Sequence, residues 1–232
     1  AEEDEYGTDH DVQPIDDLSP SVVRDNSKCI LCTRCVAACE HQTIGAIGPK
    51  NRGYAKVIGS PYDVSLAFTP CVNCGQCIVA CPVGALYEKS AVADVWGAIV
   101  DDKKKVVFYT APSVRATLGE AFGLPVGTNV EGKMVTAIKQ LGDVKCFNMD
   151  ITADLTIMEE ATELINRIKS GGTTPMFTSC CPAWVKFLEH YYPEFIPNLS
   201  TCKSPQEMFS AVLKTYYCMK EGIKPEDLYV VS

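Results

Sequence analysis

Two cysteine runs with identical spacing carry most of the chemistry that this sequence can offer. The first run contains four cysteines, Cys29, Cys32, Cys35 and Cys39. The second run contains Cys71, Cys74, Cys77 and Cys81, and Pro82 follows it. The spacing C-x2-C-x2-C-x3-C lets three thiolates surround one 4Fe–4S cluster while the fourth, one helical turn away, reaches a neighbouring cluster. The sequence therefore predicts two 4Fe–4S clusters.

The ligand sets of these clusters are expected to be crossed between the two runs. One set is Cys29, Cys32, Cys35 and Cys81, and the other is Cys71, Cys74, Cys77 and Cys39. Zinc is the alternative metal, but zinc sites usually present separated pairs of cysteines, or of cysteine and histidine. Two identical four-cysteine runs fit that pattern poorly. The first run departs from the usual cluster pattern only in that Glu40, not proline, follows it.

A second chemical feature is the adjacent pair of Cys180 and Cys181, in the stretch Thr-Ser-Cys-Cys-Pro-Ala-Trp at residues 178–184. Pro182 predicts that a helix begins directly after the pair and runs to about Tyr191. The free amides and the dipole of a helix N-terminus favour a thiolate, so a nucleophile or a metal ligand is physically reasonable here. The alternative is a pair of buried cysteines that act as small hydrophobic side chains.

The length of the chain and the order of its predicted elements indicate how it positions these groups. Its 232 residues suffice for a small cluster domain and a larger domain with its own core. Residues 1–27 are expected to be an acidic linker, and residues 28–90 an α+β ferredoxin-like domain with two clusters. Residues 91–232 are expected to be part of an α/β domain with a mainly parallel sheet flanked by helices.

Strands and helices alternate in the second half of the sequence. Strands are predicted at 106–109, 145–149, 176–178 and 228–232, in addition to one at 53–58 in the cluster domain. Helices are predicted at 114–122, around 134–141, at 153–170 and from 205 to 222. A Gly-Gly pair ends the long helix, and Ser204 opens a capping box with proline at the first helical position. The last strand has no continuation, so we expect that more of the domain follows.

Charge and composition restrict the partners and the location. Residues 1–17 carry eight acidic side chains and no lysine or arginine, which accounts for the net charge of −8, and this argues against nucleic acid as a partner. Cluster assembly requires reduced thiols, so the cysteine runs predict a reducing, cytoplasmic location. No apolar stretch approaches the length of a membrane span.

The cysteine pair resembles the first active-site signature, TSCCPxW, of the FeFe hydrogenases. Stretches at 110–115 (TAPSVR), 154–160 (DLTIMEE) and 200–205 (STCKSP) resemble the same family. The resemblance implies an H-cluster in the complete protein, which is a 4Fe–4S cubane joined to a di-iron centre carrying CO, cyanide and a dithiolate amine. It implies that Cys181 binds the cubane and that Cys180 donates and accepts protons beside the bridging amine.

The same resemblance implies a proton route through four polar residues, Glu160, Ser200, Glu163 and Arg167. Read from the residues alone, the helix at 153–170 has an apolar stripe. Its members are Leu155, Met158, Ala161, Ile165 and Ile168. The charged residues opposite the stripe then form a solvated face with a Glu163–Arg167 pair four residues apart.

Two predicted helix starts are candidate contacts for the di-iron ligands. They are Ala111, Pro112 and Ser113, and Ser204, Pro205 and Gln206. Backbone amides at a helix start can bind an anion such as cyanide, and the resemblance implies that the two turns lie on different sides of the di-iron centre. Ordinary helix capping is the alternative for Ser204. Cys146, Cys202 and Cys218 are expected to be structural, and His10, His41 and His190 to be surface or hydrogen-bonded histidines.

These observations predict a segment of an FeFe hydrogenase that reduces protons reversibly to H2, with electrons entering through the two clusters. The resemblance implies a redox partner, either ferredoxin or NAD-linked diaphorase subunits. It also implies three further H-cluster cysteines that these 232 residues lack, so the rest of the catalytic domain or another subunit must supply them. Alone, the chain is expected to be inactive. The alternatives are an iron–sulfur assembly or carrier protein of hydrogenase-like fold, and an electron-transfer module without H2 chemistry.

Overall fold

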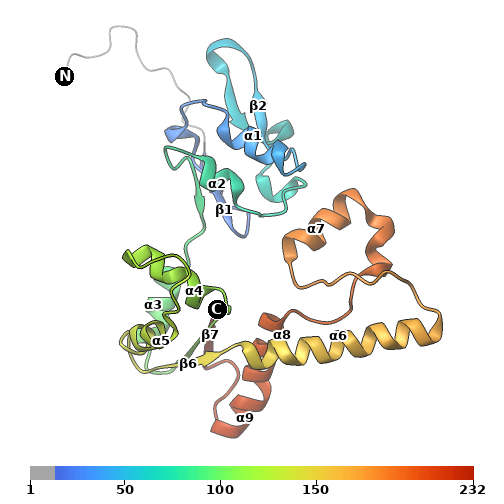
Figure 1. Ribbon diagram of the computed structural model, residues 1–232. Coiled ribbons are helices and arrows are strands. Elements are labelled where there is room, and N and C mark those ends of the chain that lie inside the picture. The colour runs from blue at the N-terminus through green and yellow to red at the C-terminus, as the bar shows by residue number, and fades with distance from the viewer. Residues whose placement is uncertain (1–13) are drawn as a thin grey trace. The chain divides into compact units, whose positions relative to one another are not determined.

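The computed structural model describes residues 14–232. His10 and most acidic side chains of the expected linker therefore lie outside the described residues. The chain divides into two compact units (Figure 1). The first contains the residues up to Ser90 together with Pro182–Pro193, and the second contains Ala91–Cys181 and Glu194–Ser232. Within the described part, no helix is long and apolar enough to cross a membrane.

The first unit combines two short antiparallel sheets with two short helices. Strands β1 (Val22–Arg24) and β4 (Leu86–Glu88) form one sheet, and β2 (Gly48–Lys50) and β3 (Val57–Gly59) form the other. Helices α1 (Arg34–His41) and α2 (Gln76–Ala80) each contain the third cysteine of a run. A small apolar core that includes Val22, Ile47, Ile58 and Leu66 lies between these elements and packs against the cluster cysteines. This is the predicted α+β ferredoxin-like arrangement.

The two cysteine runs adopt the same unusual backbone conformation. Leu31 and Thr33 flank the second cysteine of the first run, and Asn73 and Gly75 flank the second cysteine of the other. All four have φ angles between 58° and 75°. Only glycine adopts this left-handed conformation without a steric cost, so at Leu31 and Thr33 the surrounding structure must hold it. The repeat in the sequence is therefore a repeat in the fold.

Helix α7 (Pro182–Tyr191) belongs with the first unit although it directly follows the cysteine pair of the second. Pro182 is its first residue, as the sequence predicts. Ala183 and Phe187 pack against the core of the cluster unit. The sequence predicted this helix but gave no signal of what it packs against.

The second unit is built on a three-stranded parallel sheet. Its central strand β5 (Lys105–Thr110) pairs with β6 (Val144–Asn148) and β7 (Leu228–Val231). Side chains along β5 alternate between two faces, so that Val106 packs with one set of helices while Val107 and Tyr109 pack with another. Helices α3 (Val92–Val100) and α5 (Glu131–Lys139) cover the first face, and α8 (Pro205–Val212) covers the second (Figure 1). The predicted parallel sheet flanked by helices is confirmed.

Most helix boundaries follow the local signals of the sequence. The long helix α6 (Asp150–Ser170) ends at Gly171, whose φ angle is 68°. Ser204 caps α8 by accepting a hydrogen bond from the Glu207 amide at 3.2 Å. A π-helical turn at Leu213–Tyr217 connects α8 to α9 (Cys218–Glu221), and Gly222 ends this stretch as predicted. The predicted helix at 114–122 is divided into α4 (Val114–Thr117) and a 3₁₀ helix, Leu118–Phe122.

Two of the predicted strands are wrong in whole or in part. Residues 176–178 form only an isolated bridge, between Phe177 and Leu199, because the segment beside them is a loop rather than a strand of the sheet. The segment 53–58 begins with a 3₁₀ turn, Gly53–Ala55, because Gly53 has a φ angle of 57°. Only Val57 and Ile58 of that prediction belong to strand β3.

Candidate functional site

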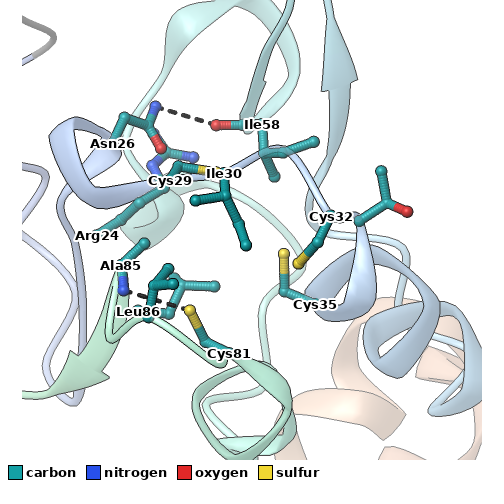
Figure 2. Close-up of a pocket in the computed structure, with 12 residues that line it drawn as sticks. Arg24, Asn26, Cys29, Ile30, Cys32, Cys35, Ile58, Cys81, Ala85 and Leu86 are labelled. Carbon is teal, nitrogen blue, oxygen red and sulfur yellow. Dashed lines mark hydrogen bonds between the residues drawn. The ribbon is translucent and has the colours of Figure 1, made fainter.

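Each predicted set of cluster cysteines lines one pocket of the first unit. Cys29, Cys32, Cys35 and Cys81 line the first pocket, and Cys71, Cys74, Cys77 and Cys39 line the second. Figure 2 shows the sulfur atoms of Cys32, Cys35 and Cys81 turned toward one space in the first pocket. The fold thus gathers three cysteines of one run with the last cysteine of the other. Their binding to iron remains a proposal.

The arrangement of these cysteines suits a cluster better than a single ion. In residues 14–232, no three histidine, cysteine or carboxylate side chains are close enough together to hold one metal ion. Tetrahedral zinc binds sulfur at about 2.3 Å, which would require four thiols crowded around one point. A 4Fe–4S cluster is wider and is bound at its corners by four separated thiolates. The donor set therefore fits the cluster.

Backbone amides donate hydrogen bonds to the fourth cysteine of each run, which is expected to complete the ligand set of the other run. The Ala46 amide donates to Cys39 Sγ at 3.3 Å, and the Ala85 amide donates to Cys81 Sγ at 3.2 Å. The second of these bonds is drawn in Figure 2. Such N–H···S bonds stabilise negative charge on sulfur and are one of the means by which proteins set cluster potentials.

Burial controls the protonation of the cysteines in the absence of metal. It raises the pKa of Cys77 to about 12, and the charges of neighbouring cysteines add to the effect. Burial likewise raises the pKa values of Cys35 and Cys71. At Cys81 burial acts in the same direction, but amide donors from Val83 onward outweigh it and lower the pKa. Because the ligands bind as thiolates, cluster formation must release protons from the buried thiols.

Cys180 and Cys181 are both exposed at the end of the loop that leads to α7. The preceding residue fixes this loop, because Ser179 Oγ donates to the carbonyl oxygens of Ser200 at 2.9 Å and Cys202 at 3.2 Å. The cysteine pair is therefore adjacent in sequence to a side chain that contacts the turn containing Ser200. The alternative of a buried, inert pair does not fit the observed exposure.

The carboxylate of Glu163 is surrounded by donors. Arg167 Nη2 lies 2.6 Å from its Oε1, Ser200 Oγ donates to Oε2 at 3.0 Å, and the Thr201 amide donates to Oε2 at 3.1 Å. Cys202 Sγ lies 3.6 Å from Oε2. Burial alone would raise the pKa of Glu163, but the hydrogen bonds from Arg167, Thr201 and Ser200 outweigh it and lower the pKa. Three of the four residues of the expected proton route therefore meet at one point.

The fourth residue of that route, Glu160, is half-buried one helical turn before Glu163. Cys202, which the sequence suggested was structural, belongs to the same group of contacts. Its place two residues after Ser200 in the STCKSP stretch was the available signal. Burial and the nearby Glu163 charge raise the pKa of Cys202, although a hydrogen bond with Ser200 acts in the opposite direction.

Helix α6 is covered on its polar side, not on its apolar stripe. The side chains of Glu163 and Arg167 are only 16% and 15% exposed, because the loop at 197–202 and the start of α8 pack there. Met158 and Ile168 of the stripe are 68% and 64% exposed. The solvated charged face that the helical pattern suggested is therefore wrong for this pair. An apolar helix face is left without a covering element in the described part of the chain.

The two helix starts expected near the di-iron ligands come from opposite ends of this unit's sequence. Tyr109 Oη, at the end of β5, donates to the Gln206 carbonyl at 3.0 Å. This bond brings the start of α8 to the carboxyl end of the strand that leads into Ala111, Pro112 and Ser113. Ala111 and Pro112 line a cavity of about 170 Å³, which also contacts Arg115. Within residues 14–232, no hydrogen bond joins Cys180 or Cys181 to either helix start.

Comparison with known proteins shows the family of this chain. Residues 104–232 match the model of the iron-only hydrogenase large subunit, C-terminal domain, and residues 28–86 match the 4Fe–4S dicluster domain. The chain belongs to the iron-only hydrogenase family. The first match begins at strand β5 and includes the cysteine pair, and the second covers both cysteine runs. The family's cofactors are therefore 4Fe–4S clusters here and an H-cluster in the complete protein.

Individual relatives extend the comparison. The chain is 47% identical over 223 residues to the NADP-reducing hydrogenase subunit HndD of Solidesulfovibrio fructosivorans, and 47% identical over 219 residues to iron hydrogenase 1 of Clostridium pasteurianum. These alignments include 93% and 94% of this chain but only 38% of each relative. An apo FeFe-hydrogenase structure from Chlamydomonas reinhardtii has a TM-score of 0.56 and 38% identity, over 61% of this chain and 37% of that chain.

A more distant relative carries a different name. The cytosolic Fe–S cluster assembly factor NAR1 of Candida dubliniensis is 30% identical over 175 residues, which is 75% of this chain and 29% of that protein. The chain therefore spans less than two fifths of the length of each of these curated relatives.

Proposed function

We propose that this chain is the electron-input unit and first catalytic portion of an FeFe hydrogenase, an oxidoreductase that reduces protons reversibly to H2. The observation that carries the proposal is the contact through Ser179. Its hydroxyl joins the cysteine-pair loop to the turn of Ser200, and Ser200 in turn donates to Glu163. A thiol next to a carboxylate and hydroxyl network is what proton delivery to a buried redox centre requires.

The chain's own residues would hold the cofactor and move protons. When bound, the H-cluster supplies the two-electron chemistry of H2. Cys181 contributes one thiolate ligand to its cubane, and Cys180 exchanges protons as a thiol. Glu160, Ser200, Glu163 and Arg167 connect that thiol to solvent. Arg167 keeps the Glu163 carboxylate in place by donating two hydrogen bonds to Oε1, from Nε at 3.0 Å and from Nη2 at 2.6 Å.

The helix starts at Ala111, Pro112 and Ser113 and at Ser204, Pro205 and Gln206 would contact the anionic ligands of the di-iron centre. The support is their common placement near the carboxyl end of β5, where open parallel sheets bind ligands. The hydroxyl of Ser204 is already engaged in capping α8. Its contribution to ligand binding would therefore come from the polypeptide backbone around it.

The first unit would pass electrons to this centre through two 4Fe–4S clusters with crossed ligand sets. The donor is ferredoxin or a set of NAD-linked diaphorase subunits. The relative named as an NADP-reducing hydrogenase subunit supports the second possibility. A cytoplasmic location follows from the need of the eight ligand cysteines for a reducing compartment.

The 232 residues alone would not hold an H-cluster. Cys181 is one exposed thiol, and Cys146, Cys202 and Cys218 do not lie beside it in any described contact. The exposed apolar stripe of α6 supports the same conclusion, because a catalytic domain must cover that face to exclude water. The remaining ligands come from the rest of the catalytic domain or from another subunit.

The second candidate is an iron–sulfur assembly or carrier protein, and the relative named as an assembly factor supports it. The exposed cysteine pair and the Glu163 network favour the hydrogenase, because a carrier needs no proton route. Infrared spectroscopy of the full-length, matured protein distinguishes the two. CO and cyanide bands together with H2 production are expected. Clusters without those bands and without H2 production would contradict the hydrogenase function and leave the carrier.

A further inference from the structure

One face of helix α7 lies against the second cluster site of the first unit. Ala183, Phe187 and Tyr191 follow one another at intervals of four residues and so share a face. The first two pack against the core that surrounds the cluster cysteines. Tyr191 Oη donates a hydrogen bond to the carbonyl oxygen of Ile44 at 2.5 Å.

The segment that Tyr191 contacts follows the proposed cluster ligand Cys39 in the sequence and spans residues 39–46. Within it, the Ile44 amide donates to the Cys39 carbonyl at 3.2 Å, and the Ala46 amide donates to Cys39 Sγ at 3.3 Å. The tyrosine therefore fixes a loop whose amide bonds directly to a sulfur of the predicted ligand set.

The same helix carries a positively charged side chain, Lys186, directly before Phe187. It is half-buried and lies three residues after Ala183, so it stands at the edge of the packed face of α7. The Lys186 charge is close enough to act on Cys71. Cys71 and Cys39 belong to the same proposed ligand set, so Lys186 and Tyr191 both act on this cluster site.

We propose that Lys186 and Tyr191 are positioning residues that raise the reduction potential of the cluster held by Cys39, Cys71, Cys74 and Cys77. This inference rests on the proposed ligand sets. Reduction adds an electron to an already anionic cluster, so a nearby cation and an N–H···S bond both stabilise the reduced state. Because Pro182 directly follows Cys181, the helix that sets this potential begins at the proposed ligand of the catalytic cluster.

The test is a redox titration of the reconstituted 232-residue chain, followed by electron paramagnetic resonance. Lys186→Gln removes the charge, and Tyr191→Phe removes only the hydroxyl. For Lys186→Gln we expect the ratio of reduced to oxidised cluster at a fixed potential to fall at least threefold, which is about 28 mV at 59 mV per tenfold change. Tyr191→Phe should shift the same cluster in the same direction by a smaller amount.

Two references accompany this titration. The cluster at Cys29, Cys32, Cys35 and Cys81 is an internal reference, and its potential should not change. The control variant is Lys133→Gln, at an exposed position of α5. It removes one positive charge from the other unit and should leave both cluster potentials unchanged. Unchanged potentials in Lys186→Gln and Tyr191→Phe, with full iron content, would overturn the inference and leave the ligand sets intact. A parent chain without two reducible clusters would overturn the ligand sets, and this inference with them.

Discussion

The two units of this protein differ in how completely they gather their cysteines. The first unit gathers all eight cysteines of the two runs so that each expected ligand set lines a pocket, although Cys32 and Cys74 are exposed. The second unit leaves Cys180 and Cys181 exposed and leaves the apolar stripe of α6 uncovered. One unit thus contains a complete donor set within 60 residues, whereas the other contains one part of a larger site.

The difference follows from how far apart the required residues lie in the sequence. In the first unit a short motif places three donors in one tight turn, and a second copy of the motif supplies the fourth. In the second unit the residues expected near the H-cluster come from four distant stretches, at 111–113, 160–167, 180–181 and 200–206. Such a site depends on tertiary packing, and it forms only when every contributing element is present.

The largest effect is expected at the cysteine pair, in the full-length protein. Cys180→Ser should leave the cofactor bound but lower H2 turnover by about 10²- to 10⁴-fold, because a hydroxyl exchanges protons far less readily than a thiol near neutral pH. Cys181→Ser should instead reduce the amount of bound H-cluster, as measured by its infrared bands. Cys146→Ser, in strand β6, is the matched control and should change neither. Near-normal turnover of Cys180→Ser would show that the pair does not relay protons.

The next effect concerns the covered polar side of α6. Glu163→Gln keeps the shape of the side chain but removes the charge that Arg167 and the Thr201 amide contact. We expect a loss of about 1–3 kcal/mol in the free energy of unfolding of the 232-residue chain, measured by urea denaturation. Turnover of the full-length protein should fall as well. Glu159→Gln, on an exposed position of the same helix, should leave both unchanged. Equal stability of the two variants would contradict the described network.

A smaller effect is expected in the pH dependence of the cluster-free chain. The folded state raises the pKa of Cys77 from 9.0 to about 12, so its contribution to stability is complete below pH 9 and is lost as the pH rises toward 12. Glu163 has a pKa below 4.5 in the folded state, so its contribution is lost as the pH falls below that value. Alkaline pH should therefore weaken the first unit through Cys77, and acid pH should weaken the second through Glu163. Asp16 and Asp25, whose pKa values hydrogen bonds lower, give the first unit an acid dependence of its own.

The two tryptophans report on these changes separately. Trp184 lies in α7 of the first unit and Trp96 in α3 of the second. In single-tryptophan variants, the urea midpoint followed at Trp184 should fall between pH 9 and 12. The midpoint followed at Trp96 should fall below pH 4.5. A midpoint at Trp184 that stays constant between pH 9 and 12, or a midpoint at Trp96 that stays constant below pH 4.5, would contradict these contributions of Cys77 and Glu163.

Local signals in the sequence were sufficient for much of this structure. The cysteine spacing predicted which residues share a pocket, and Pro182, Ser204, Gly171 and Gly222 marked helix ends correctly. These features depend on the conformation of a few neighbouring residues. The family resemblance was also confirmed by the comparisons. Which residues bind the clusters and carry protons stays a prediction.

The features that the sequence could not supply are contacts between distant segments. Nothing in the pattern of α7 shows that Tyr191 bonds to Ile44, 147 residues away. The periodicity of α6 likewise suggested a solvated charged face, whereas the loop around Leu199 covers it by accepting from Arg167. The expected strand at 176–178 consists of Met, Phe and Thr, but in the described residues it pairs only through the single bridge of Phe177 with Leu199.

The most direct test of the account is the iron and sulfide content of two double variants of the 232-residue chain. The parent should hold about eight iron and eight sulfide atoms. With crossed ligand sets, Cys29→Ser with Cys81→Ser disables one cluster and should leave about four of each, whereas Cys29→Ser with Cys39→Ser disables both and should leave none. The reverse result, with none in the first variant and about four in the second, would mean that each run binds its own cluster and would contradict the account.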